Sequence, residues 1–80
     1  MFSVYVLQSK KDGKFYIGQT KNMTERLQRH NEGRVPSTKS RIPFVIVHCE
    51  FYATRSEAMK REQYLKSLKG SRQFKEFLGL

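Results

Sequence analysis

One carboxylate in the second half of the sequence, Glu62, occupies a position that packing alone does not explain. Ala58 and Leu65 belong to one apolar stripe of a predicted helix, and Glu62 lies on the same stripe between them. A carboxylate that faces a protein core is unfavourable unless it is paired or binds a metal. Two interpretations stay open: an ion pair with one of the many arginines, or a Mg²⁺ ligand beside a phosphate group.

A second pair of reactive side chains, Arg26 and His30, lies earlier in the chain. The two residues are four apart in a predicted helix, so they share a face and lie close together. The planar guanidinium matches a phosphate, and an imidazole can transfer a proton near neutral pH. A solvent-exposed basic face, to which Arg29 would also belong, is the alternative interpretation and is favoured for this pair taken alone.

Two tyrosines, Tyr5 and Tyr16, lie in segments rich in β-forming residues that an Asp-Gly pair separates. That pair is a strong signal for a tight hairpin turn. With residues 10–13 as the loop, Tyr5 lies opposite Gly18 and Leu7 lies opposite Tyr16. Both tyrosine rings then share one face of the hairpin, and Gly18 is expected to leave an open spot beside Tyr5. Ordinary amphipathic packing also accounts for tyrosines in strands.

The elements that must position these side chains follow from capping and periodicity. Asn22 and Thr54 each begin a capping box, and Gly33 and Gly70 are expected to end the two helices that follow. The predicted elements are strands at 2–8 and 15–20, a helix from 22 to 33, a basic loop at 34–43, a strand at 44–52, a helix from 54 to about 69, and a short helix at 72–78. The expected fold class is α+β, a small three-stranded antiparallel sheet flanked by helices in the order ββαβαα, in a single domain over 1–80.

Two expectations about packing accompany this order. The near-continuous apolar character of the strand at 44–52 predicts that both of its faces are buried. The final helix is expected to place Phe74, Phe77 and Leu78 in the core.

The charge of the chain points to a class of partner. Sixteen Lys and Arg residues stand against seven Asp and Glu residues, which gives a formal net charge of +9. A field this positive on a small domain favours polyanions, nucleic acid before membrane. A merely solvated basic surface is the alternative.

The cysteine content and the N-terminal segment predict the compartment. Cys49 is the single cysteine of the sequence, so it forms no internal disulfide, and a zinc ribbon is excluded as well. The N-terminal segment has neither a basic region nor a long apolar run, so no signal peptide or membrane span is expected. The protein is therefore predicted to be cytoplasmic and not bound to a membrane.

Taken together in chain order, these residues resemble the GIY-YIG nuclease superfamily. The segment at 3–5, Ser-Val-Tyr, stands in place of the first motif, and Tyr-Ile-Gly at 16–18 matches the second motif without change. Arg26 and His30 then follow in a helix and Glu62 in a later one, in the order and spacing of the family. The match covers nearly the whole chain and is most similar to small standalone bacterial members.

The resemblance implies cleavage of a phosphodiester with the help of one divalent ion. Glu62 matches the glutamate that binds this ion, Mg²⁺ or Mn²⁺, beside the scissile phosphate. Tyr5 matches the tyrosine that orients or deprotonates the attacking water, with the hydroxyl of Tyr16 close by. Arg26 matches the arginine that stabilises the transition state, and His30 matches a histidine that assists the proton relay.

The resemblance and the charge together imply nucleic acid as the partner, DNA ahead of RNA. Gly18 is expected at this surface, and four basic residues flank the predicted site in sequence and are expected to contact phosphates: Arg34, Lys39, Arg41 and Lys60. The sequence shows no attached DNA-binding domain. Target choice is therefore expected to come from the domain itself or from a protein partner.

Two other functions stay open beside the nuclease. The first is a non-catalytic nucleic-acid-binding module that retains the nuclease fold. It is favoured by the lack of any asparagine after Asn31, since the family often supplies one beyond the metal-binding glutamate. The second is an interaction adaptor whose charge is incidental. The combined presence of two tyrosines, an arginine and a glutamate in family order favours the nuclease.

Overall fold

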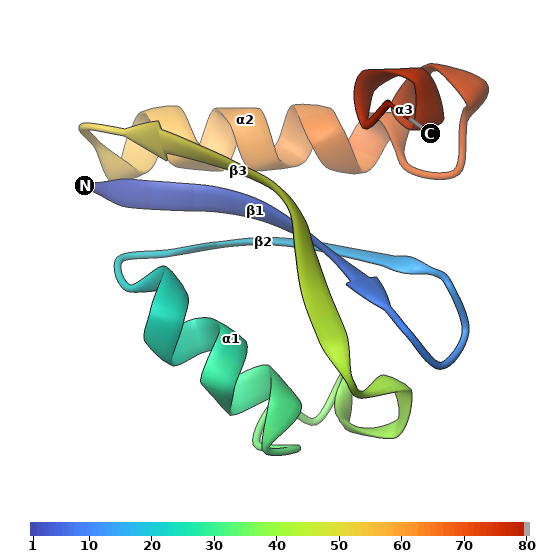
Figure 1. The fold of residues 1–80 in the computed structure, drawn as a ribbon. Coiled ribbons are helices and arrows are strands. Elements are labelled where there is room, and N and C mark those ends of the chain that lie inside the picture. Colours follow the sequence, from blue (N-terminus) through green and yellow to red (C-terminus); the bar gives the residue numbers. More distant parts are fainter. Residues whose placement is uncertain (80) are drawn as a thin grey trace.

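Three antiparallel strands form one sheet, in the spatial order β2-β1-β3, in the computed structural model, which describes residues 1–79 (Figure 1). The elements are β1 (Phe2–Ser9), β2 (Phe15–Thr20), α1 (Met23–Asn31), the 3-10 turn η1 (Lys39–Arg41), β3 (Phe44–Tyr52), α2 (Arg55–Leu68) and α3 (Arg72–Phe77). The predicted α+β class and the order ββαβαα are confirmed. Leu80, the last residue of the predicted domain, lies outside the described residues.

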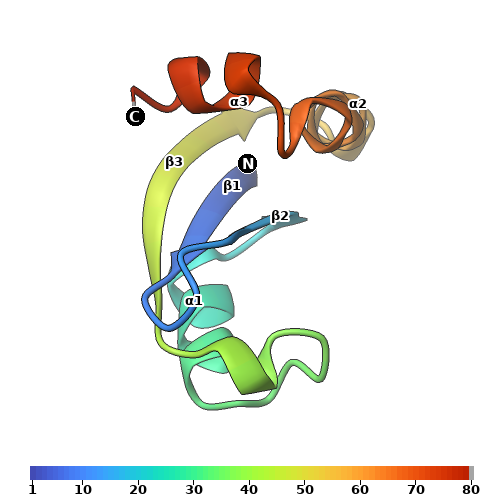
Figure 2. The ribbon, with the colours of Figure 1, turned by 90° about the vertical axis from the view of Figure 1, so that its right-hand side faces the viewer.

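Helices lie on both sides of the sheet, as Figures 1 and 2 show. α2 and α3 cover one face, and α1 and η1 lie on the other. The alternation of side chains along β1 produces these two layers. Val4 and Val6 pack with Leu65 of α2, and Tyr5 and Leu7 pack on the α1 side. No helix within residues 1–79 is long and apolar enough to cross a bilayer.

The predicted burial of β3 on both faces was wrong, because β3 is an edge strand. Among the described residues it pairs only with β1, and Val45, Ile46 and Phe51 are 38%, 41% and 62% exposed. The central strand is β1, and its residues 3–7 are all buried. A continuous apolar run indicates what a strand can bury, whereas the order of strand pairing decides what it does bury.

The helix α3 and the residue after it bring two of the three predicted aromatic and aliphatic side chains into the core. Phe74 is fully buried, and Leu78 packs beside the same cluster. The expectation for Phe77 was wrong: its ring is 38% exposed and lies edge-on to the imidazole of His48, with 4.7 Å between ring centroids. The guanidinium of Arg61 also lies 5.4 Å from the centre of the Phe77 ring, so this ring packs against polar side chains rather than in the core.

The helices begin where the capping residues predict. The side chain of Asn22 accepts a hydrogen bond from the backbone N–H of Glu25 at 3.0 Å, and Thr54 accepts one from Glu57 at 3.2 Å. Gly33 follows α1 with a φ of +74°, a left-handed conformation that a residue with a Cβ adopts only with strain. Each of the two N-caps, Asn22 and Thr54, contributes about 1 kcal/mol to the stability of its helix.

The register of the hairpin is the predicted one. Tyr5 pairs with Gly18 and Leu7 pairs with Tyr16 across β1 and β2. The backbone N–H of Lys14 donates to the carboxylate of Asp12 at 2.8 Å within the turn. Turn chemistry at one end of the hairpin therefore determines which side chains share a face several residues away.

Candidate active site

Three aromatic side chains meet on the face of the sheet that α1 covers. Tyr5 of β1 and Tyr16 of β2 lie with ring centroids 6.4 Å apart and planes 28° from parallel. The imidazole of His30, on α1, lies edge-on to both rings, with centroid distances of 6.1 Å to Tyr5 and 5.0 Å to Tyr16. Three elements thus bring together side chains that are far apart in sequence.

The expected open spot beside Tyr5 at Gly18 was wrong, because the Tyr5 ring itself fills that space. A Cβ atom added to Gly18 would lie 2.5 Å from the hydroxyl oxygen of Tyr5 and 2.7 Å from the adjacent ring carbon. Any side chain at this position would displace the phenol. Gly18 therefore permits the Tyr5 ring to lie across the neighbouring strand, and its contact with nucleic acid stays a prediction.

A buried chain of hydrogen bonds runs from Tyr5 through His30 to Thr38. The Tyr5 hydroxyl lies 3.2 Å from Nε2 of His30, and Nδ1 of His30 lies 2.8 Å from the Thr38 hydroxyl oxygen. The Thr38 hydroxyl donates to the carbonyl oxygen of Val35 at 3.3 Å. Its oxygen therefore accepts from Nδ1–H, which leaves Nε2 of His30 to accept the proton of Tyr5.

Thr38 is a residue of this site that sequence reasoning missed. It is fully buried, as is His30, and lies at the start of η1 within the predicted basic loop. Two other hydroxyl residues, Ser37 and Ser40, stand close to it in the sequence, and both are exposed. No local signal separates the three, because the path of the loop decides which hydroxyl reaches the imidazole.

The environment keeps both members of the Tyr5–His30 hydrogen bond neutral. Burial raises the pKa of the Tyr5 phenol well above its usual range, and the neighbouring Tyr16 raises it further. Burial also lowers the pKa of His30, as do the positive charges of Arg26 and Arg29. Near neutral pH the proton therefore rests on Tyr5, and the imidazole is an uncharged acceptor.

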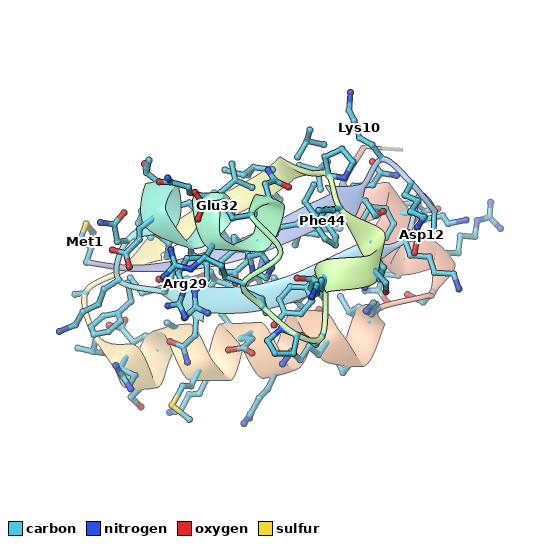
Figure 3. The ribbon with its side chains drawn as sticks, turned by 90° about the horizontal axis from the view of Figure 1, so that it is seen from below. Met1, Lys10, Asp12, Arg29, Glu32 and Phe44 are labelled. Atoms are coloured by element: carbon cyan, nitrogen blue, oxygen red, sulfur yellow. The ribbon has the colours of Figure 1, made fainter. Side chains whose placement is uncertain are left out.

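Arg26 and Arg29 extend the site along α1. Arg26 lines two adjoining hollows of about 160 and 350 Å³, the first shared with Arg29 and the second with Arg55. Both α1 arginines are half-buried, unlike the residues of a fully solvated face. Figure 3 looks onto this side of the molecule and labels Arg29.

The guanidinium of Arg29 has an unsatisfied donor. Its Nε atom is buried and has no hydrogen-bond partner anywhere in the part of the chain that the structure describes. A buried N–H without a partner is unfavourable, and the penalty is larger for a charged group. Arg29 also lines the hollow beside α1, so it joins Arg26 as a candidate phosphate contact.

Glu62 lies on α2, and its side chain is only 16% exposed. One carboxylate oxygen accepts from Nζ of Lys66 at 2.7 Å, so the ion-pair partner is a lysine of the same helix rather than an arginine. The negative charge of Glu62 raises the pKa of Tyr5, whereas the charge of Arg26 lowers it. The electrostatic influence of both groups therefore reaches the Tyr5 phenol, from helices on opposite faces of the sheet.

Glu62 could contribute one carboxylate ligand to a divalent cation. Residues 1–79 contain no group of three or more His, Cys, Asp or Glu side chains that could form a closed metal cage. Magnesium is commonly held by one or two carboxylates together with substrate phosphates and water. The ammonium of Lys66 already places a positive charge on this carboxylate, and it would have to swing aside.

The four basic residues predicted to contact phosphates lie in different environments. Arg34 is exposed and pairs with Glu32 at 3.3 Å. Arg41 pairs with Asp12 of the hairpin turn at 3.0 Å. Lys39 and Lys60 are exposed. The phosphate contacts of all four residues stay predictions.

Comparison with known families agrees with the motifs and the geometry. The model of the GIY-YIG catalytic domain matches residues 1–76. The chain therefore belongs to the GIY-YIG domain family, which confirms the resemblance seen in the sequence.

Its relatives include several bacterial UPF0213 proteins. The chain is 42% identical over 73 residues to a UPF0213 protein of Bacillus licheniformis, a match that covers 90% of this chain and 72% of the relative. It is 40% identical over 76 residues to one of Streptococcus pneumoniae, covering 94% and 75%. A solution NMR structure of a UPF0213 protein from Bacillus halodurans matches with a TM-score of 0.58 and 36% identity, covering 98% of this chain and 82% of that one.

Proposed function

We propose that this domain is a divalent-metal-dependent endonuclease that hydrolyses phosphodiester bonds, in DNA ahead of RNA. The observation that carries the proposal is the buried Tyr5–His30–Thr38 hydrogen-bond chain, with the charges of Arg26 and Glu62 acting on the Tyr5 hydroxyl. A core that only had to pack would not need a tyrosine and a histidine hydrogen-bonded to each other beside two opposite charges. Membership of the GIY-YIG family supports the same chemistry.

In the proposed reaction, Tyr5 transfers a proton rather than resting as a phenolate. The raised pKa of Tyr5 disfavours a resting phenolate, so the hydroxyl passes its proton to Nε2 of His30 as it takes one from the attacking water. The water oxygen forms a bond to phosphorus, and the bond from phosphorus to the leaving oxygen breaks. The leaving oxygen takes a proton from solvent, and His30 returns its extra proton to solvent through Tyr5, which restores the neutral pair. Thr38 accepts from Nδ1–H and so stabilises the imidazolium that forms.

The charged residues around the site have the remaining roles in the proposed reaction. Arg26 is proposed to donate to the non-bridging phosphate oxygens, with the guanidinium of Arg29, which lines the same hollow, as a further donor. Glu62 would hold Mg²⁺ or Mn²⁺, which supplies charge neutralisation at the phosphate and at the leaving oxygen when bound. Lys66, released from Glu62, would then be free to contact a phosphate.

A non-catalytic nucleic-acid-binding module is the second candidate function. It is favoured by one observation, the absence of an asparagine after Asn31. Asn31 itself is committed to structure, since its side-chain amide donates to the backbone carbonyl of Phe44 and accepts from its N–H. In α2, the hydroxyl of Ser67 donates to the carbonyl of Tyr64, so it is not free to replace the family asparagine.

The place of action is proposed to be the cytoplasm, on nucleic acid, with a protein partner supplying target choice where the domain does not. The single cysteine, Cys49, supports a reducing compartment, because the protein does not depend on an internal disulfide.

Cleavage assays with matched variants test the nuclease. Labelled single-stranded, duplex and branched DNA and RNA are incubated with Mg²⁺ or Mn²⁺ and with a chelator. We expect metal-dependent cleavage that is lost in Glu62→Gln and retained in Glu76→Gln, a matched change at another glutamate with an i,i+4 cationic partner. Thermal unfolding of both variants is the control for folding. If neither the wild type nor either variant cleaves any substrate, and all three still bind nucleic acid, the domain is a non-catalytic binding module instead.

A further inference from the structure

A hollow of about 650 Å³ lies at the end of the molecule where the β1–β2 turn, η1 and the corner between α2 and α3 come together. Figure 2 looks onto this end. Its volume is within the range of roughly 300–1,000 Å³ that small-molecule sites occupy. None of the tyrosines, the histidine or the glutamate of the candidate active site lines it.

Positive charge predominates around this hollow. Lys14, Lys69, Lys75 and Arg41 line it, against the single carboxylate of Asp12. That carboxylate pairs with Arg41 at 3.0 Å, and none of the three lysines forms an ion pair within residues 1–79. Partial desolvation lowers the pKa of Lys69, and the neighbouring charges of Arg41 and Lys66 lower it further.

One wall of the hollow is aromatic. Phe15 is half-buried and meets the fully buried Phe74 edge-on, with 5.4 Å between ring centroids. A phosphate alone would use the lysines but not this wall. A nucleotide combines a phosphate with a flat base, and bases stack on aromatic side chains in single-strand-binding proteins.

A line of side chains along α2 connects the hollow with Glu62. Glu62 and Lys66 are spaced i and i+4 on one face of α2, and Lys69, the residue that follows the last turn of the helix, comes three residues later. The rise from Glu62 to Lys69 is about 10 Å at 1.5 Å per residue. This rise corresponds to about three stacked nucleotides at 3.4 Å per step.

We propose that this hollow binds a nucleotide of the substrate strand about three steps away from the phosphate held beside Glu62. The phosphate of that nucleotide contacts Lys69 and Lys75, and its base packs on Phe15. The inference rests on the proposed binding of nucleic acid, but it requires neither cleavage nor a metal ion.

Chemical-shift titration of the ¹⁵N-labelled protein with small probes tests the ligand class. The probes are thymidine 5′-monophosphate, thymidine and inorganic phosphate, all without divalent metal. We expect the amides of Gly13 and Gly70, which line the hollow, to shift most strongly with the nucleotide and to saturate at the lowest concentration. Equal affinity for phosphate and nucleotide would overturn the role of the aromatic wall, and shifts confined to Gly18 would overturn the site.

Binding of fluorescent single strands of increasing length tests the spacing. Lys69→Gln combined with Lys75→Gln should strongly weaken the binding of a dinucleotide at the hollow and should weaken longer strands, which keep their other contacts, by a smaller factor. For strands of six nucleotides or more it should reduce the log–log salt slope by about one, because both lysines contact the same phosphate. The matched control, Lys10→Gln with Lys11→Gln, removes the same charge from exposed residues that do not line the hollow.

A third variant tests the aromatic wall. Phe15→Leu should weaken the binding of longer strands by at least about fivefold, the loss expected for one stacked base. Thermal unfolding of the Phe15→Leu variant is measured alongside. If this variant does not fold, the lysine variants provide the test, because they change exposed side chains. Lysine variants that behave like the Lys10 and Lys11 control at every length would refute the proposal.

The outcomes separate this inference from the proposed nuclease. If cleavage depends on Glu62 but the Lys69/Lys75 variant binds nucleic acid like the Lys10/Lys11 control, the nuclease proposal is supported and the nucleotide site is refuted. If the Lys69/Lys75 variant loses affinity as predicted but no cleavage occurs under any metal condition, the nucleotide site is supported and the domain is a binding module.

Discussion

A single buried hydroxyl, that of Thr38, determines which nitrogen of His30 carries the proton. The Thr38 oxygen accepts from Nδ1–H because its own proton is donated to Val35. The imidazole is therefore held as the tautomer that can accept the Tyr5 proton at Nε2. Thr38 touches neither the attacking water nor the phosphate in the proposed reaction, so it is a positioning residue.

Replacing Thr38 by valine should slow cleavage while the fold survives. Valine keeps the volume but leaves Nδ1–H without a partner, at a cost of about 1–3 kcal/mol in stability. We expect the single-turnover rate to fall about tenfold to a hundredfold, the usual effect of losing a group that orients a reactive histidine. Thr38→Ser should restore the rate. The ¹⁵N shifts of His30 should report a changed tautomer in the valine variant only, whereas unchanged shifts would contradict the positioning role.

A substitution of Arg26 distinguishes a catalytic contact with the phosphate from a contact that only contributes to binding. It lies on α1 one turn before His30, and its charge acts on the Tyr5 hydroxyl. Lysine keeps the charge but loses the planar fork, so Arg26→Lys should reduce the single-turnover rate by about two to three orders of magnitude. Binding should change by less than about 1 kcal/mol, because other cations dominate affinity.

Gel-shift and single-turnover assays on one preparation measure both effects of Arg26→Lys. Lys60→Gln, a change of a predicted phosphate contact on the exposed side of α2, is the comparison. A parallel loss of rate and affinity in Arg26→Lys would make Arg26 a simple anchor.

At the scale of elements, one carboxylate joins the edge strand to the long helix. Glu50 of β3 receives both a 2.8 Å and a 3.0 Å hydrogen bond from the guanidinium of Arg61 on α2. His48 and Tyr52, its neighbours on the same face of β3, contact the carboxylate at 2.6 and 2.7 Å. Burial alone would raise the pKa of Glu50, but the bonds from Arg61, Tyr52 and His48 outweigh it and lower that pKa to about 2.

The shifted pKa of Glu50 predicts how stability depends on pH. The folded-state pKa lies below the ordinary value of 4.5, so this contribution is fully present above about pH 4.5 and is lost as pH falls toward about 2. Glu50→Gln should cost about 1–2 kcal/mol at neutral pH and should flatten this part of the pH profile. Urea unfolding between pH 2 and 7 measures both, and a profile as steep as that of wild type would assign the acid sensitivity to other carboxylates.

At the scale of the whole molecule, the excess of positive charge determines how tightly any polyanion is held. The net charge of +9 is spread over a domain with a radius of gyration of 12.2 Å. Such a charge density contributes affinity without sequence preference, and salt weakens it.

Binding of nucleic acid should therefore depend steeply on salt. With four or five phosphate contacts, the slope of log affinity against log salt concentration should be about −3 to −5. Fluorescence anisotropy with a labelled duplex and a labelled single strand, between 50 and 200 mM salt, measures it. A flat response in both would remove nucleic acid as the partner.

Local patterns in the sequence determined most of the elements and part of the site. The Asp-Gly turn set the hairpin register, which placed Tyr5 and Tyr16 on one face. Capping residues located the starts of α1 and α2, because a cap acts on backbone groups only three residues away. These signals are short-range, so they can be read without knowledge of the rest of the fold.

Tertiary structure decided what depends on distant segments. The pairing of β1 with both other strands made β3 an edge, although β3 has the most continuous apolar run. The path of the loop selected Thr38 for His30, and the Tyr5 ring occupied the space above Gly18. Strand order, loop path and ring orientation depend on contacts between residues far apart in the chain, and local periodicity carries no information about those contacts.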